Sequence, residues 1–319
     1  MRSFLQHLRA SVDQWLDRIW PVAPPPRLAP APPETSANYE PLTRIILTDG
    51  VSRTLFEQYA QHRDSERGSE ETGWVLLGLR QVEEAIVLAT LPAGAAREAG
   101  VAHVRFNADA QALASRILRQ GDRRLVILGV VHTHPGSLRH PSQGDYEGDR
   151  QWVRLLRGGD GIFGIGTADA PEEAVHALVA EQPKPHVQTL LGLRFTWYAL
   201  ARGDERYRLL PVQLTLGPDL AAPLHHVWEI IEEHAVRLER ICQQLAKVRF
   251  AIPEAEEPTL EASVAIESGR RLGVRLTAKA ARYGEVIDDD WKPLAEHDPQ
   301  PDHGLFALLA EWSGKEPGG

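Results

Sequence analysis

Residues 125–131, LVILGVV, form an almost continuous apolar run of strand length. A strand with one solvated face alternates apolar and polar residues, whereas this run contains no polar residue. Such a run is typical of a central strand that is covered on both faces. It therefore predicts a domain in which helices pack against a sheet. The polar residues that follow it lie at a strand end, where sheets of this kind often place their sites.

Strand and helix patterns alternate around this run, through residues 43–200. Apolar residues recur with helical spacing in three segments, and short strand-like runs separate them. Asn107 is placed to cap the second helix, and Gly121 is placed to end it. We therefore expect an α/β fold, with strands at 44–48, 72–79, 83–91, 101–107, 125–131, 161–168 and within 190–200, and helices at 51–63, 108–120 and 143–157.

Two segments precede this core. Within residues 1–20, apolar side chains recur at steps of three and four, which predicts an amphipathic helix. Seven of the thirteen residues 21–33 are proline, so 21–39 is expected to be an extended linker and the core domain to span 40–204. The helix is expected to pack on the body of the protein. Binding to a partner or to a membrane surface is the alternative, although basic residues are few for a membrane surface.

The C-terminal segment, 205–319, is expected to be an α+β extension. Residues 224–248 place apolar side chains at alternating steps of four and three, interrupted by His234, which is the spacing of a heptad seam. Such a helix packs either against its own neighbours or against a second copy in a homodimer. Residues 263–287 are expected to form a β-hairpin, with an exposed Pro/Glu-rich stretch at 253–262 before it and an acidic tail after it.

Composition excludes several classes of protein. Asp and Glu number 44 against 35 Lys and Arg, and this acidic balance argues against nucleic-acid binding, which depends on neutralising phosphates. Cys242 is the single cysteine, so a disulfide framework and a cysteine-rich zinc site are excluded. No segment is long and apolar enough to span a bilayer and no signal peptide is recognisable, so we expect a cytoplasmic protein without membrane association.

The most informative segment is HTHPGSLRHPSQGD, residues 132–145. On an extended chain His132 and His134 point to the same face, and Asp145 can return to the same point from the following helix. Two imidazoles and one carboxylate form a three-ligand zinc site with one position open for water. The alternatives are locally hydrogen-bonded histidines at a strand end, and a capping box in which Ser142 and Asp145 begin the helix. The capping box is compatible with a metal site, because a helix N-terminus holds both side chains in place.

The string H-T-H-P-x6-S-x2-D resembles the signature of the JAMM (JAB/MPN+) metalloproteases. That family also has a glutamate at the start of a strand reading E-T-x-x-x-L-x-G, and Glu71 opens the matching ETGWVLLG at 71–78. Trp74 stands where glycine is frequent, but it faces away from Glu71, so we expect changed packing and an intact site. The resemblance covers about residues 43–200 and implies a cytidine-deaminase-like fold, in which helices flank a mixed, curved β-sheet.

The resemblance also implies the roles of the site residues. Glu71 is the general base that takes the proton of the attacking water, and Ser142 donates a hydrogen bond to the oxyanion. His140 matches no position of the motif and is expected at the surface. One Zn²⁺ per chain is implied, and its ligands are His132, His134 and Asp145.

The activity implied by the resemblance is that of a zinc-dependent (iso)peptidase. It would cleave after the C-terminal glycine of a ubiquitin-like protein ending in Gly-Gly, by deconjugation or by maturation of a precursor. The terminal extensions are similar to those of bacterial members that act with activating and conjugating enzymes, which are therefore further expected partners.

Four other classes of protein are alternatives to this one. A non-catalytic JAMM-like scaffold in a protein-modification complex is one alternative. A RadC-like protein is another, although its motif H-x-H-P-S-G-D-P-x-P-S is not matched by the Gly-Ser-Leu at 136–138. A cytidine deaminase needs a PCxxC pair and a zincin needs HExxH, and the sequence has neither.

Overall fold

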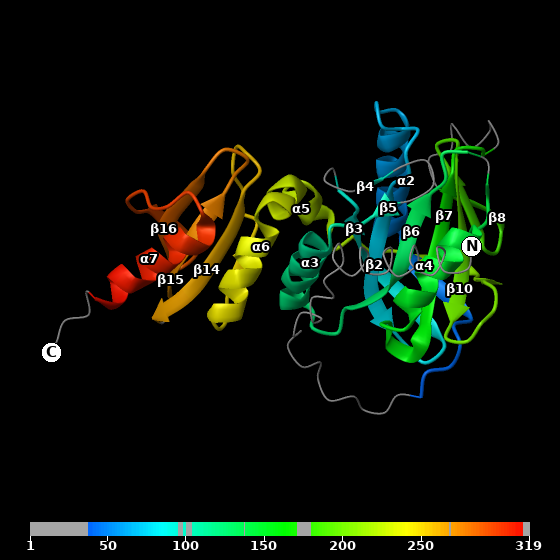
Figure 1. Ribbon diagram of the computed structural model, residues 1–319, viewed down its shortest axis with the longest axis horizontal. Coiled ribbons are helices and arrows are strands. Elements are labelled where there is room, and N and C mark those ends of the chain that lie inside the picture. Colours follow the sequence, from blue (N-terminus) through cyan, green and yellow to red (C-terminus); the bar gives the residue numbers. More distant parts are fainter. Residues whose placement is uncertain are drawn as a thin grey trace, which may run out of the picture. The chain divides into compact units, whose positions relative to one another are not determined.

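A mixed ten-stranded sheet forms the framework of the core domain (Figure 1). The computed structural model describes residues 38–94, 98–99, 104–136, 138–170, 180–267 and 269–314. The expected helix within 1–20 and all but the last two residues of the expected linker 21–39 therefore lie outside the described residues. The strand order is β12-β1-β3-β2-β6-β7-β10-β9-β8, with β11 paired to β10. The strands are β1 (Arg44–Thr48), β2 (Gly73–Arg80), β3 (Glu84–Pro92), β6 (Val126–Thr133), β7 (Asp160–Thr167), β8 (Glu181–Lys184), β9 (Val187–Leu190), β10 (Leu193–Ala201), β11 (Arg208–Leu209) and β12 (Val212–Thr215).

β6 lies in the interior of this sheet, between β2 and β7, as its apolar run predicted. It pairs antiparallel with β2 and parallel with β7, so the sheet is mixed as expected. The register with β2 shifts beside Gly129, where β6 carries one extra residue. The φ of Gly129 is 152°, and a Cβ there would lie 1.8 Å from the carbonyl oxygen of Ile162. Only glycine therefore fits this bulge in the strand that leads to the two histidines.

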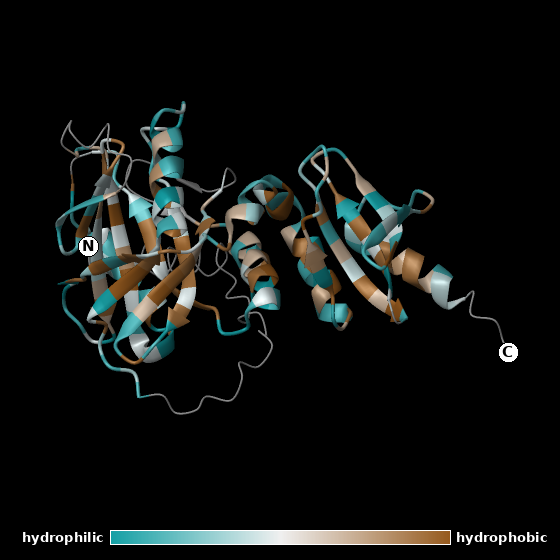
Figure 2. Cartoon of the chain, turned by 180° about the vertical axis from the view of Figure 1, so that it is seen from behind, coloured by the Kyte–Doolittle hydropathy of each residue, from teal (hydrophilic) through white to brown (hydrophobic). Residues whose placement is uncertain are grey.

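Helices cover both faces of the sheet. α2 (Asp49–Arg63) packs on one face, where Trp74 of β2 joins its apolar side chains in one buried cluster. α3 (Ala108–Gly121) packs on the other face, in a cluster that contains Val75. Neighbouring residues of β2 thus point into two different cores, which explains why its sequence is apolar throughout. Figure 2 shows apolar residues concentrated along the strands.

Side-chain caps set the helix boundaries. Thr48 accepts a hydrogen bond at the start of α2, so that helix begins two residues earlier than expected. Asn107 caps α3 as expected, whereas Gly121 is the last residue of the helix and Asp122 follows as its C-cap. α4 (Gln143–Val153) begins where expected and ends four residues earlier than expected.

The structure corrects or extends three strand predictions. The strand expected within 190–200 is β10, which forms a hairpin with β9, because Leu191 and Gly192 both have positive φ and turn the chain between them. The described part of 101–107 contains strand only at β5 (Val104–Arg105), which pairs with β4 (Glu98–Ala99) outside the large sheet. β11 and β12 follow residue 204, yet β12 pairs in parallel with β1 and belongs to the large sheet.

The C-terminal segment builds a second, five-stranded antiparallel sheet, in the order β13-β14-β15-β16-β17. The expected hairpin is part of this sheet, and Leu260, expected in an exposed stretch, is fully buried where β14 begins. The expected acidic tail instead contains β17 and a helix, α7, that packs against β15 and β16. The elements are α5 (Ala222–His225), α6 (Trp228–Gln244), β13 (Arg249–Ala251), β14 (Leu260–Glu267), β15 (Arg270–Leu276), β16 (Ala281–Ile287), β17 (Asp290–Pro293) and α7 (Pro301–Ser313).

The heptad seam of 224–248 is covered within the chain. Ile231 and Leu238 of α6 are fully buried in the cluster that also contains residues of α3, β14 and α7. Arg116 of α3 and Glu239 of α6 form an ion pair of 2.7 Å beside this cluster. The helix thus packs against its own neighbours, as the first interpretation had it, and Leu238 is not exposed to a second copy. None of the helices in the described ranges is long and apolar enough to cross a membrane.

Candidate metal centre

Two histidines meet at the end of the central strand. His132 is the penultimate residue of β6, and the N–H of His134 donates to the carbonyl of Gly166, which continues the pairing with β7 by one more bond. Both side chains are buried, at 7% and 5% exposure. Their Nε2 atoms lie 3.1 Å apart, so the same-face geometry expected from their spacing is present.

The carboxylate of Asp145 faces both histidines from the first turn of α4. Its Oδ1 lies 3.2 Å from Nε2 of His132, and its Oδ2 lies 3.4 Å from Nε2 of His134. Ser142 caps the helix: its Oγ accepts from the N–H of Asp145 at 3.2 Å, and its own N–H donates to Oδ2 of Asp145 at 2.5 Å. Asp145 therefore belongs both to the capping box and to the candidate ligand set, and the cap holds its carboxylate in place.

The spacing of these three side chains suits a zinc ion. Zinc binds nitrogen or oxygen at about 2.0–2.1 Å, and a tetrahedral arrangement then separates its ligand atoms by about 3.3 Å. The two Nε2 atoms lie 3.1 Å apart, and each lies 3.2 or 3.4 Å from a different oxygen of the Asp145 carboxylate, so these separations are close to that value. Among the described residues, this is the group of His, Cys, Asp and Glu side chains that could hold a metal ion.

Hydrogen bonds fix the protonation pattern that a metal would need. Nδ1 of His134 donates to the carbonyl of Leu138 at 2.7 Å, which leaves the lone pair on Nε2, the atom that faces Asp145. Burial opposes ionisation of Asp145, but its favourable interactions with the two neighbouring histidines outweigh burial, so the pKa of Asp145 is well below its usual range. The carboxylate is therefore ionised at neutral pH and ready to act as a ligand.

Glu71 comes just before β2, alongside the histidines. Gly73 of β2 is in register with His132 of β6. The N–H of Thr133 donates to the carbonyl of Thr72 at 2.9 Å, so the backbone next to Glu71 is hydrogen-bonded to the end of β6. Glu71 is 4% exposed. Burial raises its pKa to about 7, with the charge of Asp145 adding to the shift and His134 opposing it. A carboxyl group with this pKa can both accept and return a proton at neutral pH.

Three residues near the site, Glu70, His140 and Trp74, are not expected to take part in it. The carboxylate of Glu70 pairs with Arg67 at 2.7 Å, whereas the pKa of Glu71 responds to His134 and Asp145. His140 is exposed. Trp74 is buried on the opposite face of β2, where its indole N–H donates to Gln58 at 2.5 Å.

Four residues near the site were not expected from the sequence. The Leu138 carbonyl, which orients His134, carries no signal in a side-chain pattern. Asp149 is buried one helical turn after Asp145, and that i, i+4 spacing could have identified it. Tyr198 and Tyr207 come from β10 and the turn after it, more than 50 residues along the chain, and no local pattern points to them.

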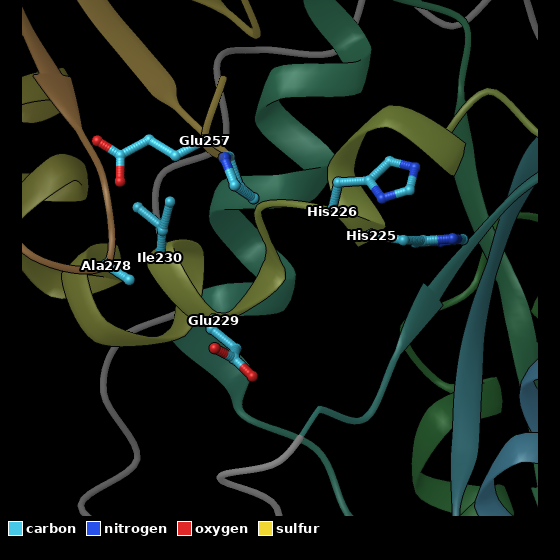
Figure 3. Close-up of a pocket in the computed structure, with 7 residues that line it drawn as sticks. His225, His226, Glu229, Ile230, Glu257 and Ala278 are labelled. Atoms are coloured by element: carbon cyan, nitrogen blue, oxygen red, sulfur yellow. The ribbon is translucent and has the colours of Figure 1, made fainter. Parts of the chain in front are cut away.

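A pocket of about 260 Å³ elsewhere in the chain shares no residue with this centre (Figure 3). It lies beside α5 and α6. Its His225 is engaged at both ring nitrogens, since Nε2 donates to the carbonyl of Thr90 at 2.7 Å and Nδ1 accepts from Gln58 at 3.0 Å. The lining residues are His225, His226, Glu229, Ile230, Glu257, Pro258 and Ala278.

The part of the chain that holds the triad of His132, His134 and Asp145 is similar to a known family. Residues 52–184 match the family described as prokaryotic homologs of the JAB domain. No curated protein matches the chain. The solution structure of a Desulfitobacterium hafniense protein is similar at 18% identity with a TM-score of 0.36, over 55% of this chain and 94% of the other.

Proposed function

Because residues 52–184 form a prokaryotic JAB domain that contains a metal-site-like triad, we propose that this chain is a zinc-dependent peptidase. The observation that carries the proposal is the convergence of two imidazole nitrogens and one carboxylate at 3.1–3.4 Å, beside a buried glutamate whose pKa is raised to about 7. A scaffold without activity would not need either feature. His132, His134 and Asp145 would hold the metal.

In the proposed hydrolysis of an amide bond, Glu71 transfers the proton and Ser142 stabilises the developing charge. A zinc ion held by the triad would supply a Lewis acid and lower the pKa of a bound water. The carboxylate of Glu71 accepts a proton from the attacking water as the water oxygen bonds to the carbonyl carbon. Glu71 then returns the proton to the amine nitrogen as the C–N bond breaks. The hydroxyl of Ser142, beside Asp145 at the N-terminus of α4, donates a hydrogen bond to the carbonyl oxygen as negative charge develops there.

The proposed substrate is a ubiquitin-like protein that ends in Gly-Gly. We propose cleavage after the terminal glycine, either from a lysine or from a short C-terminal extension, in a cytoplasmic system with activating and conjugating enzymes. The support for this is the match to the JAB domain, together with a candidate metal centre whose chemistry could hydrolyse an amide. A globular partner would supply the binding energy that orients the bond.

A paired cleavage assay tests the proposal. The protein is incubated with a ubiquitin-like fusion that carries an extension after Gly-Gly, and with the isolated tail peptide, each with and without a chelator. Chelator-sensitive cleavage of the fusion, with much slower cleavage of the peptide, is expected. Cleavage that survives complete removal of the metal would reject the metallopeptidase, whereas equal rates on both substrates would reject only the ubiquitin-like partner.

A further inference from the structure

The two segments that carry the candidate ligands have few apolar anchors. In the loop that follows His134, residues 138–140 and Ser142 are exposed. In α4 the only buried residues are Asp149 and Val153. Hydrophobic contacts hold α4 through Val153, Tyr146 and Trp152, whereas the exposed loop depends on hydrogen bonds to the sheet.

Tyr198 of β10 holds the loop. Its hydroxyl donates to the carbonyl of Arg139 at 2.9 Å, next to the Leu138 carbonyl that accepts from Nδ1 of His134. Because Leu138 and Arg139 are adjacent, the bond to the Arg139 carbonyl restrains the orientation of the Leu138 carbonyl. The Arg139 side chain also pairs with Asp169, just beyond β7. Burial raises the pKa of Tyr198 to about 12, so its hydroxyl remains a donor at neutral pH.

Tyr207 holds the helix. It lies in the turn between β10 and β11, and its hydroxyl donates to Oδ2 of Asp149 at 2.8 Å. Asp149 follows the candidate ligand Asp145 by one helical turn, so both carboxylates lie on the same face of α4. A second bond joins the helix to the same turn, because the hydroxyl of Tyr146 donates to the carbonyl of Asp204 at 2.8 Å.

The rings of these tyrosines form one cluster. The ring centroids of Tyr198 and Tyr207 lie 5.8 Å apart, and those of Tyr146 and Tyr207 lie 6.0 Å apart, both in edge-on contact. Phe163 of β7 packs edge-on against Tyr207 at 5.9 Å. The loop anchor and the helix anchor are therefore coupled through packed aromatic rings.

We propose that Tyr198 and Tyr207 are positioning residues of the metal centre, whose hydroxyls set the geometry of His134 and Asp145 and thereby the affinity for metal. This inference rests on the proposed zinc site. Neither tyrosine touches the candidate ligand atoms. Each acts through an intermediate group, the backbone at Leu138–Arg139 for one and the Asp149 carboxylate for the other.

The test removes one hydroxyl at a time and measures metal binding directly. Tyr198→Phe and Tyr207→Phe keep the rings, and the affinity for Zn²⁺ is measured by competition with a chromophoric chelator. The absorption spectrum of the Co²⁺-loaded protein reports ligand geometry. Loss of a residue that hydrogen-bonds a metal ligand weakens metal binding by about 10–100-fold. We expect a loss of about 10-fold for each variant, because each tyrosine reaches the candidate ligand through an intermediate group. The Co²⁺ bands should change in position or intensity.

Tyr283→Phe is the matched control. The hydroxyl of Tyr283 donates to the carbonyl of Asp298 at 2.6 Å in the C-terminal part of the chain, so the variant loses a bond of the same kind away from the centre. It should bind Zn²⁺ as the wild type does. Thermal unfolding of every variant defines the temperature range in which all are folded, and binding is compared within it.

The outcomes separate this inference from the one on which it rests. Wild-type protein that binds neither Zn²⁺ nor Co²⁺ would overturn the metal centre and the positioning role together. Wild-type binding with unchanged affinity and unchanged Co²⁺ spectra in both tyrosine variants would overturn the positioning role alone, even if the variants unfold at lower temperature.

Discussion

Replacing Glu71 by glutamine should separate catalysis from metal binding. The amide is close in size to the carboxylate but cannot accept a proton at neutral pH. A general base contributes about 10²–10⁴-fold, so turnover should fall by about that factor, which corresponds to about 3–5 kcal/mol of transition-state stabilisation. Zinc, measured by metal analysis, should remain near one ion per chain, because the three candidate ligands are untouched.

The same substitution should stabilise the metal-free fold at neutral and alkaline pH. Burial raises the pKa of Glu71 to about 7, from an ordinary value of 4.5. Between these values the folded state binds more protons than the unfolded state, so the free energy of unfolding falls as the pH rises through this window. The penalty is complete above pH 7 and amounts to about 1–3 kcal/mol once solvent screening is allowed for. Glutamine does not ionise and carries no such penalty.

Urea unfolding of the chelated protein at pH 5 and pH 8 measures this difference. The gain of Glu71→Gln over the wild type should be small at pH 5 and larger at pH 8. Glu70→Gln is the matched control, because Glu70 pairs with Arg67 and should leave both turnover and the pH dependence near wild type. An active Glu71→Gln beside an inactive Glu70→Gln would show that the wrong glutamate was chosen as the base. Equal pH slopes for wild type and Glu71→Gln would refute the effect of burial.

Three further substitutions test the ligands, the helix cap and the core. His134→Ala should abolish zinc binding in metal analysis, whereas His140→Ala, at the surface, should retain about one ion per chain. Ser142→Ala should keep the zinc, lower turnover in the cleavage assay and cost about 1 kcal/mol in urea unfolding through the lost cap. Leu238→Ala should cost about 2–5 kcal/mol in the same unfolding assay, since the side chain is fully buried. Val236→Ala, which is 59% exposed on the same helix, should change stability by less than about 0.5 kcal/mol.

Local patterns predicted the features that depend on neighbours in sequence. The apolar run at 125–131 is an interior strand, Asn107 caps its helix, and the box of Ser142 and Asp145 begins α4. The two histidines share a face because successive side chains of an extended chain alternate in direction. Each of these outcomes is decided within a few residues, where backbone geometry and capping bonds leave few alternatives.

Other predictions failed where distant parts of the chain decide the structure. The tail beyond 288 is polar enough to resemble an exposed segment, yet it supplies β17 and α7, because a sheet and a helix elsewhere provide the surface that buries Leu305. β12 follows the expected domain boundary, yet it joins the large sheet through its pairing with β1, some 165 residues earlier in the sequence.

The sequence by itself determined the candidate ligands, His132, His134 and Asp145, because their types and spacing are those of a three-ligand site. Only the tertiary structure decided that the two imidazoles and the Asp145 carboxylate approach one another to 3.1–3.4 Å, and that the hydroxyls of Tyr198 and Tyr207 bond the loop and the helix beside them. The reason is physical. A ligand set depends on which groups the chain contains, but its geometry depends on which distant carbonyls, carboxylates and rings the folded sheet brings beside it, and those contacts leave no periodic pattern in the sequence.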